Sequence, residues 1–229
     1  IYLMYITHTH HQRFEFIVGA YHSMKIPAAI VSRILVTAAP LIANEVLWSI
    51  GTTMINQSYS TRGLTVVAAT NITSTVWNLF CVIMFAMGNA VSIMVGQLLG
   101  AGKIEEAKDT DNKLLFFTLA THIGVGLLIA ISAPFIPMIY NTEQAVRDLT
   151  TQLLFVAGAA LPIHALSHGM YFTLRSGGKT FITFLFDCVF TWVVSLPIAF
   201  CLSRFTGVSV VVIYFCVQFA DAIKVVIGY

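Results

Sequence analysis

Six long apolar stretches, separated by short polar breaks, make up most of the chain. Each reaches the ~20 mostly apolar residues that an α-helix needs to cross the hydrocarbon core of a bilayer. None shows the alternation of apolar and polar residues that is typical of a membrane β-strand. The pattern therefore predicts six membrane-spanning helices, at about residues 34–57, 64–98, 114–139, 149–173, 180–202 and 208–228.

These helices assign residues 34–229 to one six-helix transmembrane lobe. Residues 1–33 precede the lobe, and their first residues, "IYLMYI", have the composition of the last turns of an earlier helix. The chain begins without a methionine and stops directly after an apolar run. We therefore expect it to be a piece of a longer protein whose N-terminal part lies upstream.

Composition agrees with an integral membrane protein. Apolar residues make up 58% of the 229 and charged residues 10%, with a mean hydropathy of +0.85, whereas soluble domains carry about 25% charge. A net charge of +2 is too small to indicate nucleic-acid binding. The four cysteines lie in apolar spans without CxxC spacing, which favours neither a disulfide framework nor a zinc site. The expected fold class is an all-α integral membrane protein.

Lysine and arginine are distributed unequally between alternate polar breaks. Cytoplasmic loops of membrane proteins carry the excess of these residues. One set of breaks, together with both ends of the chain, holds nine of them: Arg13, Lys25, Arg33, Lys103, Lys108, Lys113, Arg175, Lys179 and Lys224. The other set holds three, Arg62, Arg147 and Arg204. The charges predict a multi-pass protein of the cell membrane with its N-terminal stretch and its C-terminal end in the cytoplasm.

Two carboxylates lie inside predicted spans, Glu45 in "PLIANEVLW" and Asp187 in the fifth span. A charge near the bilayer centre costs about 3 kcal/mol on insertion scales, so such a residue usually faces a partner or a wet cavity. A carboxylate that alternates between a proton, a sodium ion and an organic cation is what a coupled exporter needs. We predict that Glu45 and Asp187 bind substrate or coupling ion, the alternative being buried acids bonded to neighbouring Asn, Thr or His side chains.

Polar residues recur at helical spacing along four spans, so each forms a stripe on one helix face. We predict that Asn78, His164 and His168 of these stripes, together with Trp48, line a cavity, although a single polar group can also join helices at about 0.6 kcal/mol. The stripes comprise Glu45, Ser49, Thr52 and Asn56; Asn71, Thr75, Asn78, Asn89 and Ser92; His164, His168, Tyr171 and Arg175; and Thr180, Thr183, Asp187, Thr191 and Ser195.

Histidines occur in two spacings that could hold a metal, "HTHH" at residues 8–11 and the pair His164 and His168. Membrane metal enzymes with histidine boxes need more such boxes, all on the cytoplasmic face, and this sequence has no third box. A histidine-based metal enzyme is therefore the less favoured alternative, and we expect no metal and no cofactor besides a coupling ion.

Asp221 and Lys224 stand three residues apart in the last turns of the sixth predicted helix. This spacing predicts a local ion pair, with the lysine extending its stem so that the ammonium reaches the cytoplasmic surface.

Four stretches of the sequence resemble the C-terminal half of a multidrug and toxic compound extrusion (MATE) transporter. "RILVTAAPLIANEVLW" is similar to the start of the family's seventh helix, and "AMGNAVSIMVGQLLGAGKIEEAKD" resembles the end of the eighth helix and its cytoplasmic loop. "LRSGGKTFITFLFDCVFTWVVSLPIA" resembles the junction of the tenth and eleventh helices, and "FADAIKVVIGY" fits the twelfth. The resemblance covers nearly all of residues 30–229.

The resemblance implies two six-helix lobes with a cavity between them and alternating access driven by Na⁺ or H⁺. It identifies residues 1–33 as the end of a preceding helix plus the cytoplasmic linker between lobes, with an N-terminal lobe of the same parent chain as partner. It implies a secondary antiporter, not an enzyme, that exports amphiphilic organic cations. Two alternatives remain open: a flippase for lipid-linked saccharides with the same two-lobe plan, and a half-bundle that does not transport.

Overall fold

The structure is a computed structural model that describes residues 2–9, 27–178 and 180–228. The chain divides into two compact units, Ile1–Ile42 and Ala43–Tyr229. Every regular element within the described residues is a helix. Most of the predicted linker, residues 10–26, lies outside the described part, so the predicted boundary between residues 33 and 34 stays a prediction.

The first unit contains the short helix α1 (Tyr2–Thr9) and the start of α2 (Ala28–Ser60). The hydroxyl of Thr9 donates to the carbonyl oxygen of Tyr5 at 2.8 Å and lies 3.3 Å from the carbonyl oxygen of Ile6, so it contacts two backbone acceptors near the end of α1.

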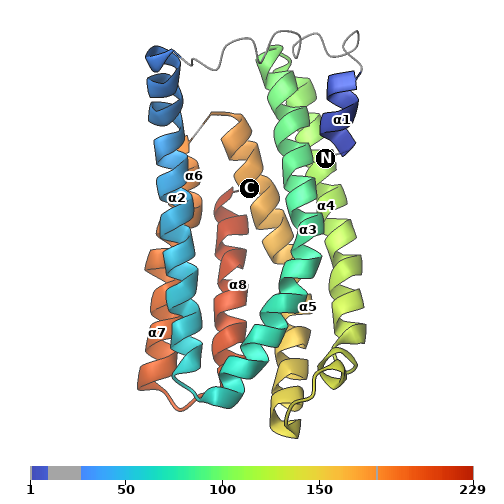
Figure 1. The fold of residues 1–229 in the computed structure, drawn as a ribbon, viewed down its shortest axis with the longest axis vertical. Helices are drawn as coiled ribbons and strands as arrows, with labels where there is room; N and C mark the ends of the chain where they lie inside the picture. The colour runs from blue at the N-terminus through green and yellow to red at the C-terminus, as the bar shows by residue number, and fades with distance from the viewer. Residues whose placement is uncertain (1, 10–26, 179, 229) are drawn as a thin grey trace. The chain divides into compact units, whose positions relative to one another are not determined.

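The second unit contains the rest of α2 and the remaining helices (Figure 1). Five segments are long and apolar enough to cross a membrane, and α2 makes a sixth when its bent halves count as one span. The predicted all-α fold with six spans is confirmed. The remaining helices are α3 (Leu64–Gly100), α4 (Ile104–Ser132), α5 (Gln144–Ser176), α6 (Thr180–Phe184), α7 (Leu196–Phe205) and α8 (Val210–Gly228), and a 3₁₀ turn η2 (Ile136–Ile139) lies between α4 and α5.

The fifth predicted span is interrupted by two π-helical turns, η3 (Leu185–Val189) and η4 (Thr191–Ser195), between α6 and α7. Such wide turns are rare and occur frequently at functional sites. The hydroxyl of Thr191 donates a hydrogen bond of 2.8 Å to the backbone carbonyl oxygen of Asp187, which links the two π-helical turns.

Helix α4 begins at Ile104, well before the predicted start at residue 114. Three ion pairs with helical spacing hold its charged first turns: Lys103–Glu106, Lys108–Glu105 and Lys113–Asp109. The helix ends at Ser132, two residues before Pro134, because a proline removes a backbone donor and clashes with the preceding turn. The apolar pattern alone missed the charged start of this helix.

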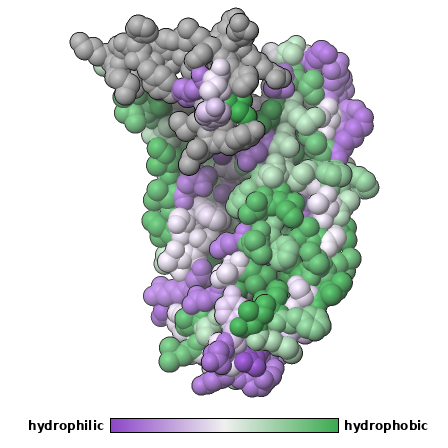
Figure 2. All heavy atoms as spheres, turned by 45° about the vertical axis from the view of Figure 1, so that its right-hand side comes forward, coloured by the Kyte–Doolittle hydropathy of each residue, from purple (hydrophilic) through white to green (hydrophobic). Residues whose placement is uncertain are grey.

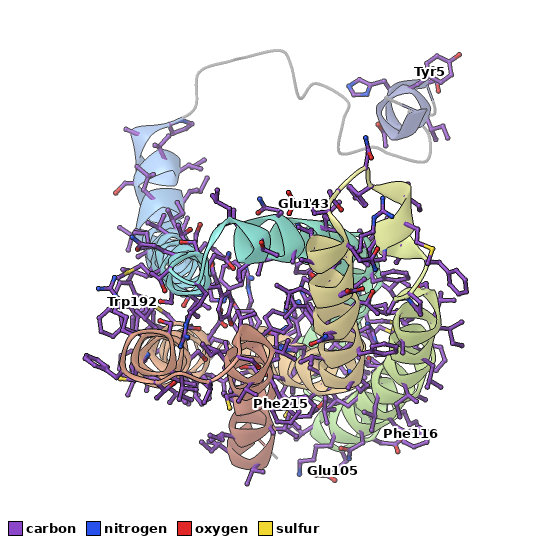
Figure 3. All side chains as sticks on the ribbon, turned by 90° about the horizontal axis from the view of Figure 1, so that it is seen from below. Tyr5, Glu105, Phe116, Glu143, Trp192 and Phe215 are labelled. Atoms are coloured by element: carbon purple, nitrogen blue, oxygen red, sulfur yellow. The ribbon has the colours of Figure 1, made fainter. Side chains whose placement is uncertain are left out.

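The bundle is built from two groups of helices. Val76, Ile129 and Leu154 form a buried core between α3, α4 and α5. Ile55 and Ile213 belong to a second core that joins α2, α7 and α8. Helix α8 lies between α5 and the α6–α7 stretch, as the view along the bundle in Figure 3 shows, and so connects the groups.

The outer surface of the candidate spans carries large apolar side chains. Phe116 on α4 is 73% exposed and points away from the bundle (Figure 3). Figure 2 shows apolar residues over the middle of this face and polar residues towards its ends. An apolar surface of this kind is stable against lipid tails, whereas soluble proteins rarely expose such large apolar patches to water.

Two glycines set the distance between α4 and α5. A Cβ atom added to Gly126 would overlap the carbonyl oxygen of Gly158, and one added to Gly158 would lie 2.7 Å from the carbonyl oxygen of Gly126. Small residues allow membrane helices to approach each other closely. A Cβ at the neighbouring Gly124 would meet open space instead.

We predict that Gly126→Ala lowers the free energy of unfolding by about 1–3 kcal/mol, because overpacking forces the two backbones apart. Gly124→Ala is the matched control on the same helix and should change stability by less than about 1 kcal/mol. Thermal unfolding in detergent measures both. Equal melting temperatures for the two variants would show that the α4–α5 contact tolerates separation.

Candidate functional site

A cavity of about 660 Å³ lies in the second unit, between α2, α3, α5, α8 and the η3–η4 segment. Three carboxylates and two permanent cations line it, so its formal charge is −1 when the histidines are neutral. The charged residues are Glu45, Asp187, Asp221, Arg175 and Lys224.

All six residues predicted for the site lie on the wall of this one cavity. They come from four different elements of the second unit. Glu45 and Asp187, the two that are farthest apart in the sequence, are separated by more residues than any single helix contains. Glu45 and Trp48 come from α2, Asn78 from α3, His164 and His168 from α5, and Asp187 from η3.

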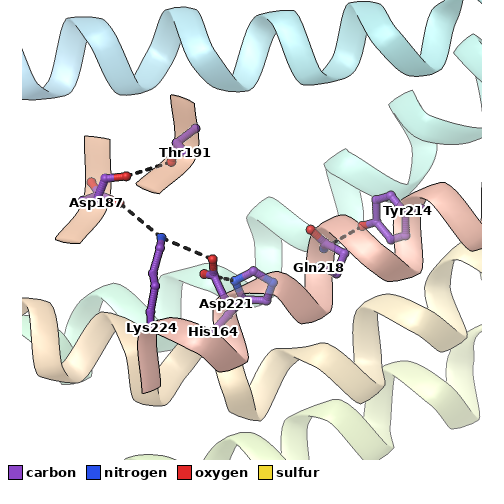
Figure 4. Close-up of polar contacts among 7 residues, drawn as sticks. All are labelled: His164, Asp187, Thr191, Tyr214, Gln218, Asp221 and Lys224. Carbon is purple, nitrogen blue, oxygen red and sulfur yellow. Dashed lines mark hydrogen bonds and ion pairs between the residues drawn. The ribbon is translucent and has the colours of Figure 1, made fainter. Parts of the chain in front are cut away.

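A chain of ionic contacts crosses the wall (Figure 4). His164 Nδ1 on α5 lies 3.0 Å from Asp221 Oδ2 on α8, within hydrogen-bonding distance. Lys224 Nζ lies 3.2 Å from Asp221 Oδ1 and 3.7 Å from Asp187 Oδ1. One ammonium group thus stands between two carboxylates and connects α8 to η3.

The predicted local pair of Asp221 and Lys224 is present, but the prediction that Lys224 reaches the cytoplasmic surface is wrong. Its side chain is only 7% exposed, and Nζ lies 4.9 Å from the centre of the Phe190 ring. A second carboxylate and a ring face stabilise the ammonium inside the bundle, so the lysine turns inward. The count of lysines and arginines on which the predicted orientation rests is lower by this residue.

Glu45 differs from the other two acids. It lines the cavity from an exposed face of α2, and no ion pair reaches it within the described part of the chain. Its neighbour Asn44 is 3% exposed and is not among the residues that line the cavity. Glu45 is therefore the carboxylate that the α2 wall offers to the cavity.

Aromatic rings surround the two histidines. The ring of Trp77 meets that of His164 edge-on at 5.1 Å between centres. His168 packs against Phe85 at 5.2 Å, Phe172 at 4.9 Å and Tyr171 at 6.1 Å. An aromatic wall beside excess negative charge can hold an organic cation through ring faces and carboxylates together.

The described residues include no group of three His, Cys, Asp or Glu side chains that could hold a metal ion. His10 and His11 of the N-terminal histidine cluster lie outside the described part. In the α5 pair, His164 is engaged with Asp221 and His168 with rings.

The polar stripe predicted on α3 meets the cavity at the one residue that was predicted to line it. Asn78 reaches the cavity, whereas Asn71, Thr75, Asn89 and Ser92 do not line it. The hydroxyl of Thr75 instead donates to the carbonyl oxygen of Asn71 in its own helix, at 2.9 Å. A hydroxyl that donates to a carbonyl oxygen of its own helix has a hydrogen-bond partner without facing water.

Helix α8 contributes wall residues that the sequence analysis did not assign to the site. Tyr214, Gln218, Asp221 and Lys224 all line the cavity, and Gln218 Nε2 donates to the Tyr214 hydroxyl at 3.0 Å. Their steps of four, three and three mark one helix face. The sequence contains this helical spacing, but Asp221 and Lys224 were interpreted as a local ion pair and so were not assigned to a cavity wall.

Comparison with known proteins agrees with this architecture. The sequence profile of the MatE family matches residues 40–201. This chain belongs to the MatE family. The predicted resemblance to one lobe of a MATE transporter is confirmed.

Two curated relatives of this MatE chain are the multidrug and toxin extrusion protein 1 of Homo sapiens and that of Pongo abelii. Each is 25% identical over 121 residues, which are 53% of this chain and 21% of the relative. This chain therefore corresponds to a minor part of their length.

Solved transporters share the fold. A MOP superfamily transporter from Pyrococcus furiosus, whose binding pocket is described as having reverse polarity, superposes with a TM-score of 0.79 at 15% identity, over 89% of this chain and 46% of its own. An outward-facing multidrug resistance MATE transporter gives 0.78 at 15%, over 90% and 46%. The chain thus spans about half the length of these transporters.

Removing one partner from the ionic chain should destabilise this MatE lobe. We predict that Asp221→Asn lowers the free energy of unfolding by on the order of 3 kcal/mol, because Lys224 then keeps only the longer contact to Asp187. The matched control is Asp109→Asn, which breaks an exposed pair with Lys113 and should cost less than about 1 kcal/mol. Chemical unfolding in detergent provides both values, and similar losses would show that the buried pairs are solvated like surface ones.

Proposed function

We propose that this MatE chain forms one lobe of a secondary antiporter that exports amphiphilic organic cations across the plasma membrane in exchange for Na⁺ or H⁺. The observation that carries the proposal is the cavity, which combines a formal charge of −1 with a wall of aromatic rings. Multidrug extrusion, named for two relatives, supports the same reading. A second lobe, the N-terminal one of the parent chain, would complete the transporter, since this chain covers 46% of the solved ones.

In this proposal Glu45 and Asp187 bind either the coupling ion or the cargo. Ion binding to a carboxylate displaces the cation, and the two facing states differ in their affinity for each. Trp48, Asn78, His164 and His168 form walls that shape the cargo site. Glu45 is the most available of the three acids, because the other two already contact Lys224.

The flippase alternative fits the cavity less well. A lipid-linked pyrophosphate calls for several uncompensated cations. Lys224 is shared by two carboxylates, which leaves Arg175 as the cation of the wall without a carboxylate partner among the described ion pairs.

The decisive experiment measures efflux of a fluorescent organic cation from cells that express the intact protein containing this chain, with the Na⁺ and H⁺ gradients collapsed separately. We expect efflux that depends on one gradient, and a loss of at least about tenfold in Glu45→Gln and in Asp187→Asn, because each removes a charge that holds a cation. Glu106→Gln is the matched control, since its carboxylate is exposed on α4 and pairs with Lys103 away from the cavity.

Absence of efflux from the well-expressed intact protein would favour the flippase, and wild-type efflux in both cavity variants would remove the site assignment. Loss in Glu106→Gln as well would point to a general defect of expression.

The proposed orientation places the turn at Ala101 in the cytoplasm and the turn at Gly207 outside. The two turns lie at opposite ends of the bundle in Figure 1, and both residues are exposed. We predict that a membrane-impermeant thiol reagent added to whole cells labels Gly207→Cys and spares Ala101→Cys until the cells are broken, in a background where the four native cysteines are replaced. The reverse pattern would invert the proposed topology.

A further inference from the structure

We propose that Lys224 is a resident counter-ion of the cavity, which competes with the organic cation for Asp187 and so weakens cargo binding enough to permit release. The inference rests on the proposed function, since it takes an organic cation as the cargo. It concerns a residue of α8 that helps to determine how strongly and how selectively this site holds a positive charge.

The two contacts of the ammonium group are unequal. Lys224 Nζ lies 3.2 Å from Asp221 Oδ1, at hydrogen-bonding length, and 3.7 Å from Asp187 Oδ1, beyond it. Asp221 is also approached by His164 Nδ1 at 3.0 Å. The bond to Asp221 is therefore the anchor of the lysine, and the contact with Asp187 is the one that a competing cation can replace.

Exposure points to the same carboxylate. The side chain of Asp187 is 23% exposed, against 14% for Asp221 and 7% for Lys224. Asp187 is thus the most exposed member of the cluster, while Asp221 and Lys224, which also line the cavity, are more covered. A bulky cation that enters the cavity reaches Asp187 before it reaches Asp221.

The lysine can release Asp187 without losing its own partners. Its four-carbon stem is flexible, and its ammonium keeps Asp221 and the Phe190 ring, 4.9 Å away. When the cargo leaves, the ammonium covers Asp187 again. Asp187 is then no longer a bare carboxylate in a low-dielectric environment, which would otherwise retain the cation strongly.

The net charge of the cluster gives the expected size of the change in cation affinity. The cluster of Asp187, Asp221 and Lys224 carries −1, and removing the lysine charge makes it −2. The other charged residues of the wall are Glu45 from α2 and Arg175 from α5, and its histidines are His164 and His168. Because the contacts are short and the side chains mostly covered, we expect the affinity for a monovalent organic cation to change by roughly tenfold or more.

The test measures the dissociation constant of tetraphenylphosphonium for the purified intact protein that contains this chain. Lys224→Met should lower the constant by roughly tenfold, while Lys224→Arg, which keeps the charge, should stay within about threefold of wild type. In an Asp187→Asn background, Lys224→Met should give little gain, because the carboxylate that the lysine covers is gone.

A second variant separates competition at Asp187 from a general change in the electrostatic field of the cavity. Lys224→Met combined with Asp221→Asn keeps the cluster at −1 and still uncovers Asp187, so it should also bind more tightly than wild type. This pair removes both members of one ion pair at once, so it serves if Lys224→Met alone unfolds.

Each outcome decides between the two proposals. Tight binding by Lys224→Met supports the inference, even where the wild type binds too weakly to measure. The inference is overturned, and the proposed function stands, if the wild type binds the cation and affinity rises neither in Lys224→Met nor in Lys224→Met combined with Asp221→Asn. The same holds if Lys224→Met raises the affinity equally in the Asp187→Asn background. Lack of binding in the wild type and in every variant overturns both.

Discussion

One ammonium group held between two carboxylates is the constraint on which the cavity depends. A charge inside a bilayer is tolerated when it has a partner of opposite sign or water beside it, and Lys224 gives two acids such a partner at once. The arrangement ties α8 to the π-helical turn η3, and through His164 to α5. Three segments that are distant in the sequence are thereby held around one set of charges.

The rest of the bundle gives this cluster a rigid frame on one side and a looser wall on the other. Helices α3, α4 and α5 share a buried core, and Gly126 and Gly158 bring two of them into close backbone contact. On the other side, the indole nitrogen of Trp192 donates to the carbonyl oxygen of Leu47 at 3.0 Å, and Ile55 packs onto α7 and α8. Glu45, the cavity acid that has no ion pair among the described residues, belongs to this second wall.

The chemistry of the wall gives the three acids different parts in the proposed transport. Asp221 serves mainly to hold Lys224 and His164, Asp187 is shared between the lysine and the cavity, and Glu45 faces the cavity without a partner in the described lobe. A cation that enters from the cavity therefore meets carboxylates of graded availability. Graded availability is useful in a carrier, because a site that binds too tightly releases its cargo slowly.

The amino-acid sequence by itself determined that the chain has six apolar helices long enough to cross a membrane and that it resembles a MATE lobe. It also predicted Glu45, Asp187 and four further residues as the polar wall of a cavity. Apolar length and a helical period are local properties, and both can be read from the order of residues. The sequence left the charged start of α4 outside the predicted span, because i,i+3 and i,i+4 ion pairs stabilise a helix that hydropathy does not register.

Only the tertiary structure decided which polar faces meet. Helical spacing fixes the face of a residue on its own helix, but the rotation of each helix against its neighbours depends on packing along the whole bundle. Asp221 and Lys224 show the difference, since a pair three residues apart looks the same at a membrane surface and in a protein interior. What turned Lys224 inward was Asp187, 37 residues earlier in the chain, on a segment that packing brings alongside α8.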